Sequence, residues 1–337
     1  MVNVGIIGAG RIGKVHVKSI CTQVANAKVK MLADPFMTEE TAAWAKSMGV
    51  ERTTNDYKEI LADPEIDAVL ICSSTDTHSS ISIEAIKAGK HVFCEKPIDH
   101  DVAKIREVIE ALEDSNVKYQ VGFNRRFDHN FEAVHRAVAD GKVGDIHVIK
   151  ITSRDPEPPC EEYVKVSGGM FLDMTIHDFD MVRFLSGCNA EEVYVEAAVL
   201  VDPAIGEAGD VDTAVITLKM ENGSIAVIDN SRKAVYGYDQ RAEVFGSKGM
   251  VATANDSASA AVISNADGVT GEKPLYFFLE RYMAAYAKEI QCFIKAIEED
   301  TDTPLGVMDG LQPVLMGLAA KKSLEEHRPV NISEIMM

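Results

Sequence analysis

The chain has 337 residues, of which 46% are hydrophobic and 26% are charged, which is ordinary for a soluble globular protein and enough for two domains. Its net charge of -19, from 34 basic and 53 acidic side chains, argues against nucleic acid or an acidic membrane surface as a partner. No apolar stretch approaches the roughly 20 residues of a membrane span, and no signal peptide precedes the first strand-like run, so we expect a cytoplasmic protein. The six cysteines include no CxxC pair, which predicts reduced thiols and no metal site.

The first 120 or so residues alternate between strand-like and helical patterns. The strand-like runs cover residues 2–7, 29–33, 68–72, 91–94 and 118–122. The helical patterns between them cover residues 12–24, 38–48, 57–62, 81–88 and 102–116. This alternation predicts a Rossmann domain over residues 1–121, that is, a doubly wound parallel sheet with right-handed crossovers.

Residues 122–337 follow a different pattern, in which strand-like runs succeed one another without helices between them. Those runs cover residues 146–153, 193–201, 211–220, 224–230 and 240–245, and Asn222-Gly223 is a hairpin signal. Helical patterns cover residues 131–140, about 170–185, 279–299 and 310–326. We therefore expect a second, α+β domain with a large, mostly antiparallel sheet, and the last helix is a candidate for packing back on the first domain.

A glycine-rich turn, Gly8-Ala9-Gly10-Arg11-Ile12-Gly13, joins the first strand to the first helix. In the dinucleotide-binding fingerprint, the first glycine allows a tight turn, the second lets the backbone approach a pyrophosphate, and the third lets the helix pack against the strand. The helix N-terminus, at Arg11 and Ile12, offers free N–H groups and a positive dipole end to the diphosphate. The alternative is a glycine turn that serves packing alone.

Asp34 ends the second strand, twenty-one residues beyond Gly13, and completes the fingerprint. A carboxylate at this position accepts hydrogen bonds from both ribose hydroxyls of NAD, and it repels the additional phosphate of NADP. Pro35 follows, and no basic residue occurs before Lys46. We therefore predict NAD as the cofactor, the alternative being an aspartate that caps the next helix.

A loop rich in hydroxyl side chains, Ser73-Ser74-Thr75-Asp76-Thr77-His78, follows the third main strand. In a doubly wound fold, the loops at the carboxyl ends of the strands line the ligand crevice. The small side chains of Ser73, Ser74 and Thr75 would let the backbone pass close to the nicotinamide half of the cofactor. We expect His78 at the beginning of a helix, where a cofactor contact, a core position and a capping role all stay open.

The next strand is followed by Glu95-Lys96-Pro97, which reaches the same crevice. Proline biases Lys96 towards extended backbone and so fixes where its side chain projects. An ammonium group there would hold a substrate oxygen and stabilise developing alkoxide charge. Glu95 would orient Lys96 or bind the cofactor, and the alternative for Lys96 is an ordinary surface position.

A second candidate site lies in Asp173-Met174-Thr175-Ile176-His177-Asp178. On a helix, Asp173 and His177 would share a face, with Cβ atoms about 6 Å apart. Asp173 would then orient the imidazole or stabilise its charged form, leaving the other ring nitrogen to take a proton from an alcohol. The alternative is a capped helix with a solvated Asp/His pair.

Three motifs together carry a family resemblance that covers essentially the whole chain. The glycine-rich turn, Glu95-Lys96-Pro97 and Asp173-x-x-x-His177 occur in the order and spacing of the glucose–fructose oxidoreductase and inositol dehydrogenase family. Finer features resemble its inositol 2-dehydrogenase branch, namely Gly122-Phe123-Asn124-Arg125-Arg126-Phe127, Ser153-Arg154-Asp155-Pro156 and Tyr236-Gly237-Tyr238-Asp239. The best-known members of this branch often carry methionine at position 124 and asparagine at position 155, so Asn124 and Asp155 both add polarity here.

The resemblance implies roles for individual residues. It implies a catalytic triad of Lys96, Asp173 and His177, which forms the substrate site together with Arg125, Asp155 and Tyr236. Tyr236 and Tyr238 would share a face if they lay on a strand, and one of them would then serve packing and not substrate binding. The complete predicted cofactor set comprises Gly8, Gly10, Arg11, Ile12, Gly13, Asp34, Ser73, Ser74, Thr75, His78, Glu95 and Lys96.

The expected function is therefore the NAD-dependent oxidation of a cyclic polyol, with myo-inositol and its 2-keto product as the first expectation. Three alternatives stay open: oxidation of another inositol isomer or a pyranose, a non-catalytic NAD-binding sensor, and glycoside cleavage through a transient keto intermediate with retained NAD. Apolar alternation over residues 211–218 leaves a wide sheet face that needs cover. The resemblance implies that such faces pair between subunits, so we expect a homotetramer.

Overall fold

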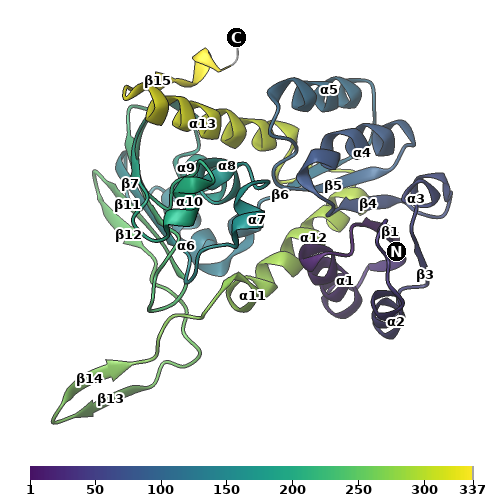
Figure 1. Ribbon diagram of the computed structural model, residues 1–337, viewed down its shortest axis with the longest axis horizontal. Helices are drawn as coiled ribbons and strands as arrows, with labels where there is room; N and C mark the ends of the chain where they lie inside the picture. The colour runs from purple at the N-terminus through teal and green to yellow at the C-terminus, as the bar shows by residue number, and fades with distance from the viewer. Residues whose placement is uncertain (336–337) are drawn as a thin grey trace. The chain divides into compact units, whose positions relative to one another are not determined.

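The computed structural model describes residues 1–335, and within it the chain forms two compact units (Figure 1). The first unit combines Met1–Phe127 with Met283–Val314, and the second combines Asp128–Tyr282 with the residues from Leu315 onwards. The chain thus passes between the units after residues 127, 282 and 314. The domain limits predicted from the sequence, 1–121 and 122–337, place a single boundary along the chain, whereas each unit of the structure combines two separate segments.

The first unit contains a six-stranded parallel sheet in the order β3-β2-β1-β4-β5-β6. Its strands are β1 (Val2–Ile7), β2 (Ala27–Ala33), β3 (Arg52–Thr54), β4 (Ala68–Ile71), β5 (His91–Glu95) and β6 (Tyr119–Gly122). Its helices are α1 (Arg11–Gln23), α2 (Glu39–Ser47), α3 (Lys58–Ala62), α4 (Thr75–Lys87), α5 (Val102–Glu113), the short 3₁₀ helix η1 (Asn124–Phe127) and α12 (Met283–Glu298). The predicted Rossmann fold is confirmed.

Apolar packing on both faces of this sheet forms the core of the first unit. Strands β1, β2, β4 and β5 are almost entirely buried, as expected for parallel strands that helices cover on both sides. Helices α1 and α12 lie side by side on one face, and α4 and α5 lie side by side on the other (Figure 1). Ile20 of α1 and Phe293 of α12 belong to one hydrophobic cluster with the strands. Burying each such side chain contributes about 1.5–3 kcal/mol.

The second unit contains a seven-stranded mixed sheet in the order β12-β11-β7-β10-β9-β8-β15. Its strands are β7 (Ile146–Arg154), β8 (Ala190–Ala198), β9 (Thr213–Met220), β10 (Ile225–Ser231), β11 (Asp239–Gly246), β12 (Gly249–Ala252) and β15 (Val330–Asn331). Strands β7 and β10 are parallel, whereas the other neighbouring pairs are antiparallel, so the predicted mostly antiparallel sheet is confirmed. The Asn222-Gly223 turn joins β9 to β10, with Gly223 at a φ of 83°.

The remaining elements of the second unit lie against one face of this sheet or extend from it (Figure 1). The helices are α6 (His129–Ala139), α7 (Glu161–Val164), α8 (Gly169–Asp173), α9 (Ile176–Ser186), α10 (Pro203–Glu207), α11 (Phe278–Arg281) and the 3₁₀ helix η2 (Ile332–Glu334). A hairpin of β13 (Val262–Asn265) and β14 (Gly268–Gly271) projects from the sheet (Figure 1). Helix α13 (Val307–Glu326) begins in the first unit and ends in the second. Within residues 1–335, no helix combines the length and apolarity needed to cross a membrane.

The helix predicted over residues 170–185 is wrong in one respect, because the structure divides it into α8 and α9. Thr175, between the two helices, is fully buried, and its hydroxyl donates to Asn230 Oδ1 at 2.6 Å. The Asn230 amide in turn donates to Asp178 Oδ2 at 2.9 Å, near the beginning of α9. These hydrogen bonds to β10 are tertiary contacts, so a local helical pattern does not reveal them. The predicted helix over residues 279–299 is likewise divided, into α11 and α12.

Candidate functional site

The glycine-rich turn between β1 and α1 has the geometry of a phosphate-binding loop. Gly8 has a φ of 105°, and a Cβ atom there would lie 2.5 Å from the Cys72 carbonyl oxygen, so only glycine fits. A Cβ atom at Gly13 would overlap the Gly8 carbonyl oxygen, which explains the close packing of α1 on β1. A Cβ atom added at Gly10 would have no other atom within 4 Å, so the space beside this glycine is open. The first turn of α1 has neither a side-chain cap nor an acidic residue. Its N–H groups therefore suit an anion.

Asp34 is tied to this turn by its side chain. Its Oδ2 accepts a hydrogen bond from the Ala9 backbone N–H at 2.7 Å, and its Oδ1 accepts one from the Phe36 N–H at 2.8 Å. The alternative that Asp34 caps the next helix is wrong, since Thr38 caps α2 by accepting from the Thr41 N–H at 3.1 Å. The half-buried Asp34 carboxylate thus lies at the glycine turn, where the predicted ribose contact requires it.

His78 connects the loops that follow β4 and β5. It lies in the first turn of α4, which begins at Thr75, and it is 2% exposed. Its Nδ1 lies 2.8 Å from the Pro97 carbonyl oxygen, and its Nε2 lies 3.0 Å from the Ser73 carbonyl oxygen. Because carbonyl oxygens only accept hydrogen bonds, both ring nitrogens must donate, and this requires the imidazolium form. Burial lowers the pKa of His78, but the Cys94 sulfur and the two carbonyls outweigh it and raise the pKa to about 9.

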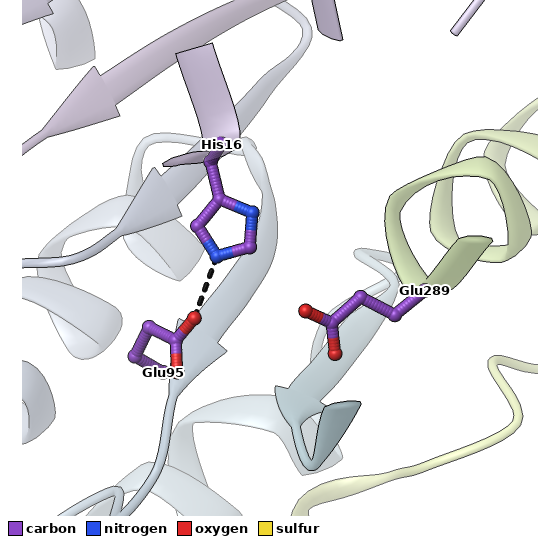
Figure 2. A group of neighbouring side chains, drawn as sticks. All are labelled: His16, Glu95 and Glu289. Carbon is purple, nitrogen blue, oxygen red and sulfur yellow. Dashed lines mark hydrogen bonds and ion pairs between the residues drawn. The ribbon is translucent and has the colours of Figure 1, made fainter. Parts of the chain in front are cut away.

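Glu95 turns its side chain towards α1. Its Oε1 lies 2.6 Å from His16 Nε2, and Figure 2 shows Glu289 of α12 pointing at this pair from the opposite side. The rings of Phe93 and Tyr286 contact His16 edge-on, with centroid distances of 5.2 and 5.8 Å, so the surroundings are apolar. Glu95 therefore pairs with His16 of α1. Lys96, which we predicted Glu95 to orient, is half-buried and directly follows β5.

The same three side chains have the spacing of metal ligands. The ligand atoms of His16, Glu95 and Glu289 all lie within 4.8 Å of one another. Among residues 1–335, however, neither Glu289 oxygen has a hydrogen-bond partner, and the residue is fully buried. Burial, together with the charge of Glu95, raises the pKa of Glu289 well above its ordinary value. The raised pKa favours the protonated form of Glu289 beside the Glu95 carboxylate.

In the second unit, a buried arginine that the sequence analysis missed connects two predicted site residues. Arg232 follows β10 and is 4% exposed. Its Nη1 donates to Asp155 Oδ2 at 3.3 Å, and its Nη2 donates to Asp173 Oδ2 at 3.1 Å. The Tyr163 hydroxyl donates to Asp173 Oδ1 at 2.9 Å. Asp155 and Arg232 come together because they follow parallel neighbouring strands, whose carboxyl ends meet at one edge of the sheet.

His177 is the second residue of α9, whereas Asp173 is the last residue of α8. The two residues thus lie on successive helices and not on the single unbroken helix that their spacing suggested. The backbone of His177 is instead held by the helix junction, where its N–H donates to the Met174 carbonyl at 3.2 Å. The Thr175–Asn230–Asp178 hydrogen bonds fix this junction against β10.

The other two predicted substrate residues lie in η1 and in the loop after β10. Arg125 is 4% exposed and lies in η1, directly after β6 in the first unit. Tyr236 is 39% exposed, and its hydroxyl donates to Asp239 Oδ2 at 2.6 Å and accepts from Arg154 Nη1 at 3.2 Å. Tyr236 and Tyr238 both lie between β10 and β11, so the expected alternation on a strand does not apply. Tyr238 packs against aromatic rings, as anticipated for one of the pair.

Comparisons with known proteins agree with this arrangement. Residues 2–123 match the model of an oxidoreductase family with an NAD-binding Rossmann fold, and residues 131–252 match the GFO/IDH/MocA C-terminal domain. The chain is 49% identical to the uncharacterized oxidoreductase YrbE of Bacillus subtilis, over 97% of this chain and 96% of that protein. It is 47% identical to the myo-inositol 2-dehydrogenase of Thermotoga maritima, over 99% of both. The crystal structure of scyllo-inositol dehydrogenase from Lactobacillus casei, with bound NAD(H) and scyllo-inositol, superposes with a TM-score of 0.92 at 32% identity and covers 99% of both chains.

Proposed function

Because the chain belongs to the GFO/IDH/MocA family of NAD-binding oxidoreductases, we propose that it oxidises a cyclic polyol, with myo-inositol and its 2-keto product as the first candidate pair. The observation that carries this proposal is the 47% identity to a myo-inositol 2-dehydrogenase over 99% of both chains. The local chemistry supports it, since Asp155 and Asp173 present carboxylates beside Arg232, and carboxylates accept hydrogen bonds from hydroxyl groups.

The first unit supplies the cofactor-binding residues in this proposal. The diphosphate of NAD would lie at Gly10 and the N-terminus of α1, with the ribose at Asp34. Ser73 and Ser74 directly precede α4, which begins at Thr75, and its N-cap residue Ser74 makes no side-chain cap hydrogen bond. NAD, when bound, supplies the acceptor for a hydride.

The roles of the reacting residues follow the family resemblance. His177 takes the proton of the substrate hydroxyl, while the C–H bond of the same carbon breaks and its electron pair leaves as hydride. Lys96 holds the oxygen as the C=O bond forms and so stabilises the developing negative charge. Asp173 supports His177 electrostatically. Arg125, Asp155 and Tyr236 complete the proposed polyol-binding set.

A screen of NAD reduction across inositol isomers and aldopyranoses tests the proposal. Absorbance of NADH that rises with one or more inositols supports a dehydrogenase and ranks the isomers. Activity with aldopyranoses alone would replace the inositol assignment by a sugar dehydrogenase. Binding of polyol without any NADH production would favour the sensor alternative, and consumption of a glycoside without accumulating NADH would favour glycoside cleavage with retained NAD.

We also propose that the protein is a homotetramer of the cytoplasm, assembled through the sheet of the second unit. Residues on one sheet face are about half exposed despite being apolar: Val215 (50%), Ile225 (48%) and Phe245 (46%). Exposed apolar side chains on a sheet face support an interaction surface there. The six cysteines are free thiols, which fits a reducing compartment.

A further inference from the structure

Arg232 differs from the arginines of ordinary surface salt bridges, because its side chain is buried and contacts two carboxylates. Its side chain is 5% exposed, and it contacts two carboxylates that belong to different elements, Asp155 after β7 and Asp173 at the end of α8. Its own backbone N–H donates to the Asp212 carbonyl at 2.8 Å, which fixes the chain at the root of the side chain. Hydrogen bonds therefore fix both the backbone and the guanidinium group of Arg232.

Three carboxylates act electrostatically on the Arg232 guanidinium, namely Asp155, Asp173 and Asp210. Burial lowers the pKa of Arg232, but these carboxylates outweigh it and raise the pKa above its ordinary value. In return, the guanidinium favours the ionised form of each carboxyl group it contacts, and its planar fork restricts their rotation.

We propose that Arg232 is a positioning residue of the polyol site. This inference rests on the proposed function and adds a residue to it: Arg232 holds Asp155 and Asp173 ionised and in fixed orientation. Both then act as acceptors for substrate hydroxyls. Without the cation, the two partly buried carboxylates would repel each other, and one would take up a proton or rotate away.

The test compares four variants: Arg232→Met, Arg232→Lys, Asp155→Asn and the double variant Arg232→Met/Asp155→Asn. Arg232→Met is expected to raise KM for the best polyol at least tenfold and to move the acid limb of kcat/KM to higher pH, because Asp173 then ionises less readily. Arg232→Lys should recover part of the loss. The double variant should bind polyol better than Arg232→Met, since the uncompensated Asp155 charge is gone.

Arg281 provides a matched control in the same unit. It is also buried and also bridges two carboxylates, with 2.8 Å to Asp128 Oδ1 and 2.8 Å to Asp256 Oδ2. Arg281→Met should lower stability but leave the polyol KM and the pH profile unchanged. If Arg281→Met matches Arg232→Met in both readouts, or if Arg232→Met keeps the wild-type KM and profile, the inference is overturned.

A measurement without substrate separates this inference from the proposed function. A double-mutant cycle between Arg232→Met and Asp173→Asn, read by chemical unfolding at pH 7, should show that the two substitutions are not additive. Additive effects would contradict the positioning role. Coupling in a protein that oxidises no polyol would instead show that the proposed substrate is wrong while the pairing stands.

Discussion

At the scale of single residues, the Asp34 carboxylate combines a structural and a proposed recognition role. Each of its oxygens accepts one backbone N–H, from Ala9 in the glycine turn and from Phe36 beyond β2. A carboxylate oxygen accepts more than one hydrogen bond, so both oxygens keep capacity for ribose hydroxyls. The contact with Ala9 also keeps the negative charge beside the turn, where a 2′-phosphate would have to approach.

We therefore predict that kcat/KM with NAD exceeds that with NADP by at least about tenfold, or roughly 1.4 kcal/mol. Asp34→Ser should narrow this ratio, because it removes the charge that repels the phosphate while retaining a hydroxyl for the turn. Steady-state kinetics with both cofactors provide the measurement. Equal efficiencies in the unmodified protein would refute the assignment of Asp34.

His78 gives a pH dependence of stability with a definite sign. Its pKa is about 9 in the folded protein and ordinarily 6.5, so the folded state binds the proton more tightly. The stabilisation is complete below pH 6.5, amounts to roughly 3 kcal/mol, and is lost as the pH rises through 9. His78→Phe should remove this slope between pH 6 and 10 in urea unfolding, and the exposed His147→Phe should keep it. An unchanged slope in His78→Phe would mean that another group titrates.

At the scale of elements, the sequence predicts most of the fold because apolar periodicity reflects burial. The buried strands β1, β4 and β5 occur within one residue of their predicted limits. Strand β3 was missed because Arg52-Thr53-Thr54 is short, polar and at the sheet edge, so it has no apolar signal. The division between α8 and α9 was missed because it depends on Thr175 contacting Asn230, 55 residues away.

The same limit applies to the candidate site. The glycine turn, Asp34 and Asp173 follow local motifs and could be predicted. Arg232 has no motif, and its role emerges from the parallel pairing of β7 and β10, which brings Ser231 opposite Arg154 and so places Arg232 near Asp155. Strands distant in sequence cannot be paired from local pattern alone.

The junction between α8 and α9 should be sensitive to loss of one hydroxyl. Thr175→Val keeps the shape of the side chain but leaves the buried Asn230 Oδ1 without this donor, which should cost about 1–3 kcal/mol. Thr301→Val, on an exposed position after α12, should change stability by less than about 0.5 kcal/mol. Urea unfolding of both variants provides the comparison, and equal effects would contradict a special role for the junction.

At the scale of the whole molecule, the exposed apolar positions of the second unit predict self-association. Light scattering at micromolar concentration should give the mass of a tetramer, four times 36.7 kDa. Phe245→Glu should shift the mass towards smaller species, because it introduces a charge into the sheet face that we propose to be buried between subunits. A monomeric mass for the unmodified protein would contradict this assembly.

The division of the chain into two units also predicts that cofactor binding and proton transfer respond separately to mutation. His177 lies in the second unit, whereas the proposed NAD-binding residues lie in the first. His177→Ala should reduce turnover by about 10² to 10⁴, the usual contribution of general acid–base catalysis, with little change in the NAD dissociation constant. Lys96→Ala should reduce turnover too, but it should also weaken NAD binding, since Lys96 follows β5 in the first unit. Stopped-flow turnover and fluorescence titration of NAD give the two quantities for each variant. A His177→Ala protein that keeps its turnover, or that loses NAD affinity instead, would remove His177 from the reaction and leave it a structural residue of the α8–α9 junction.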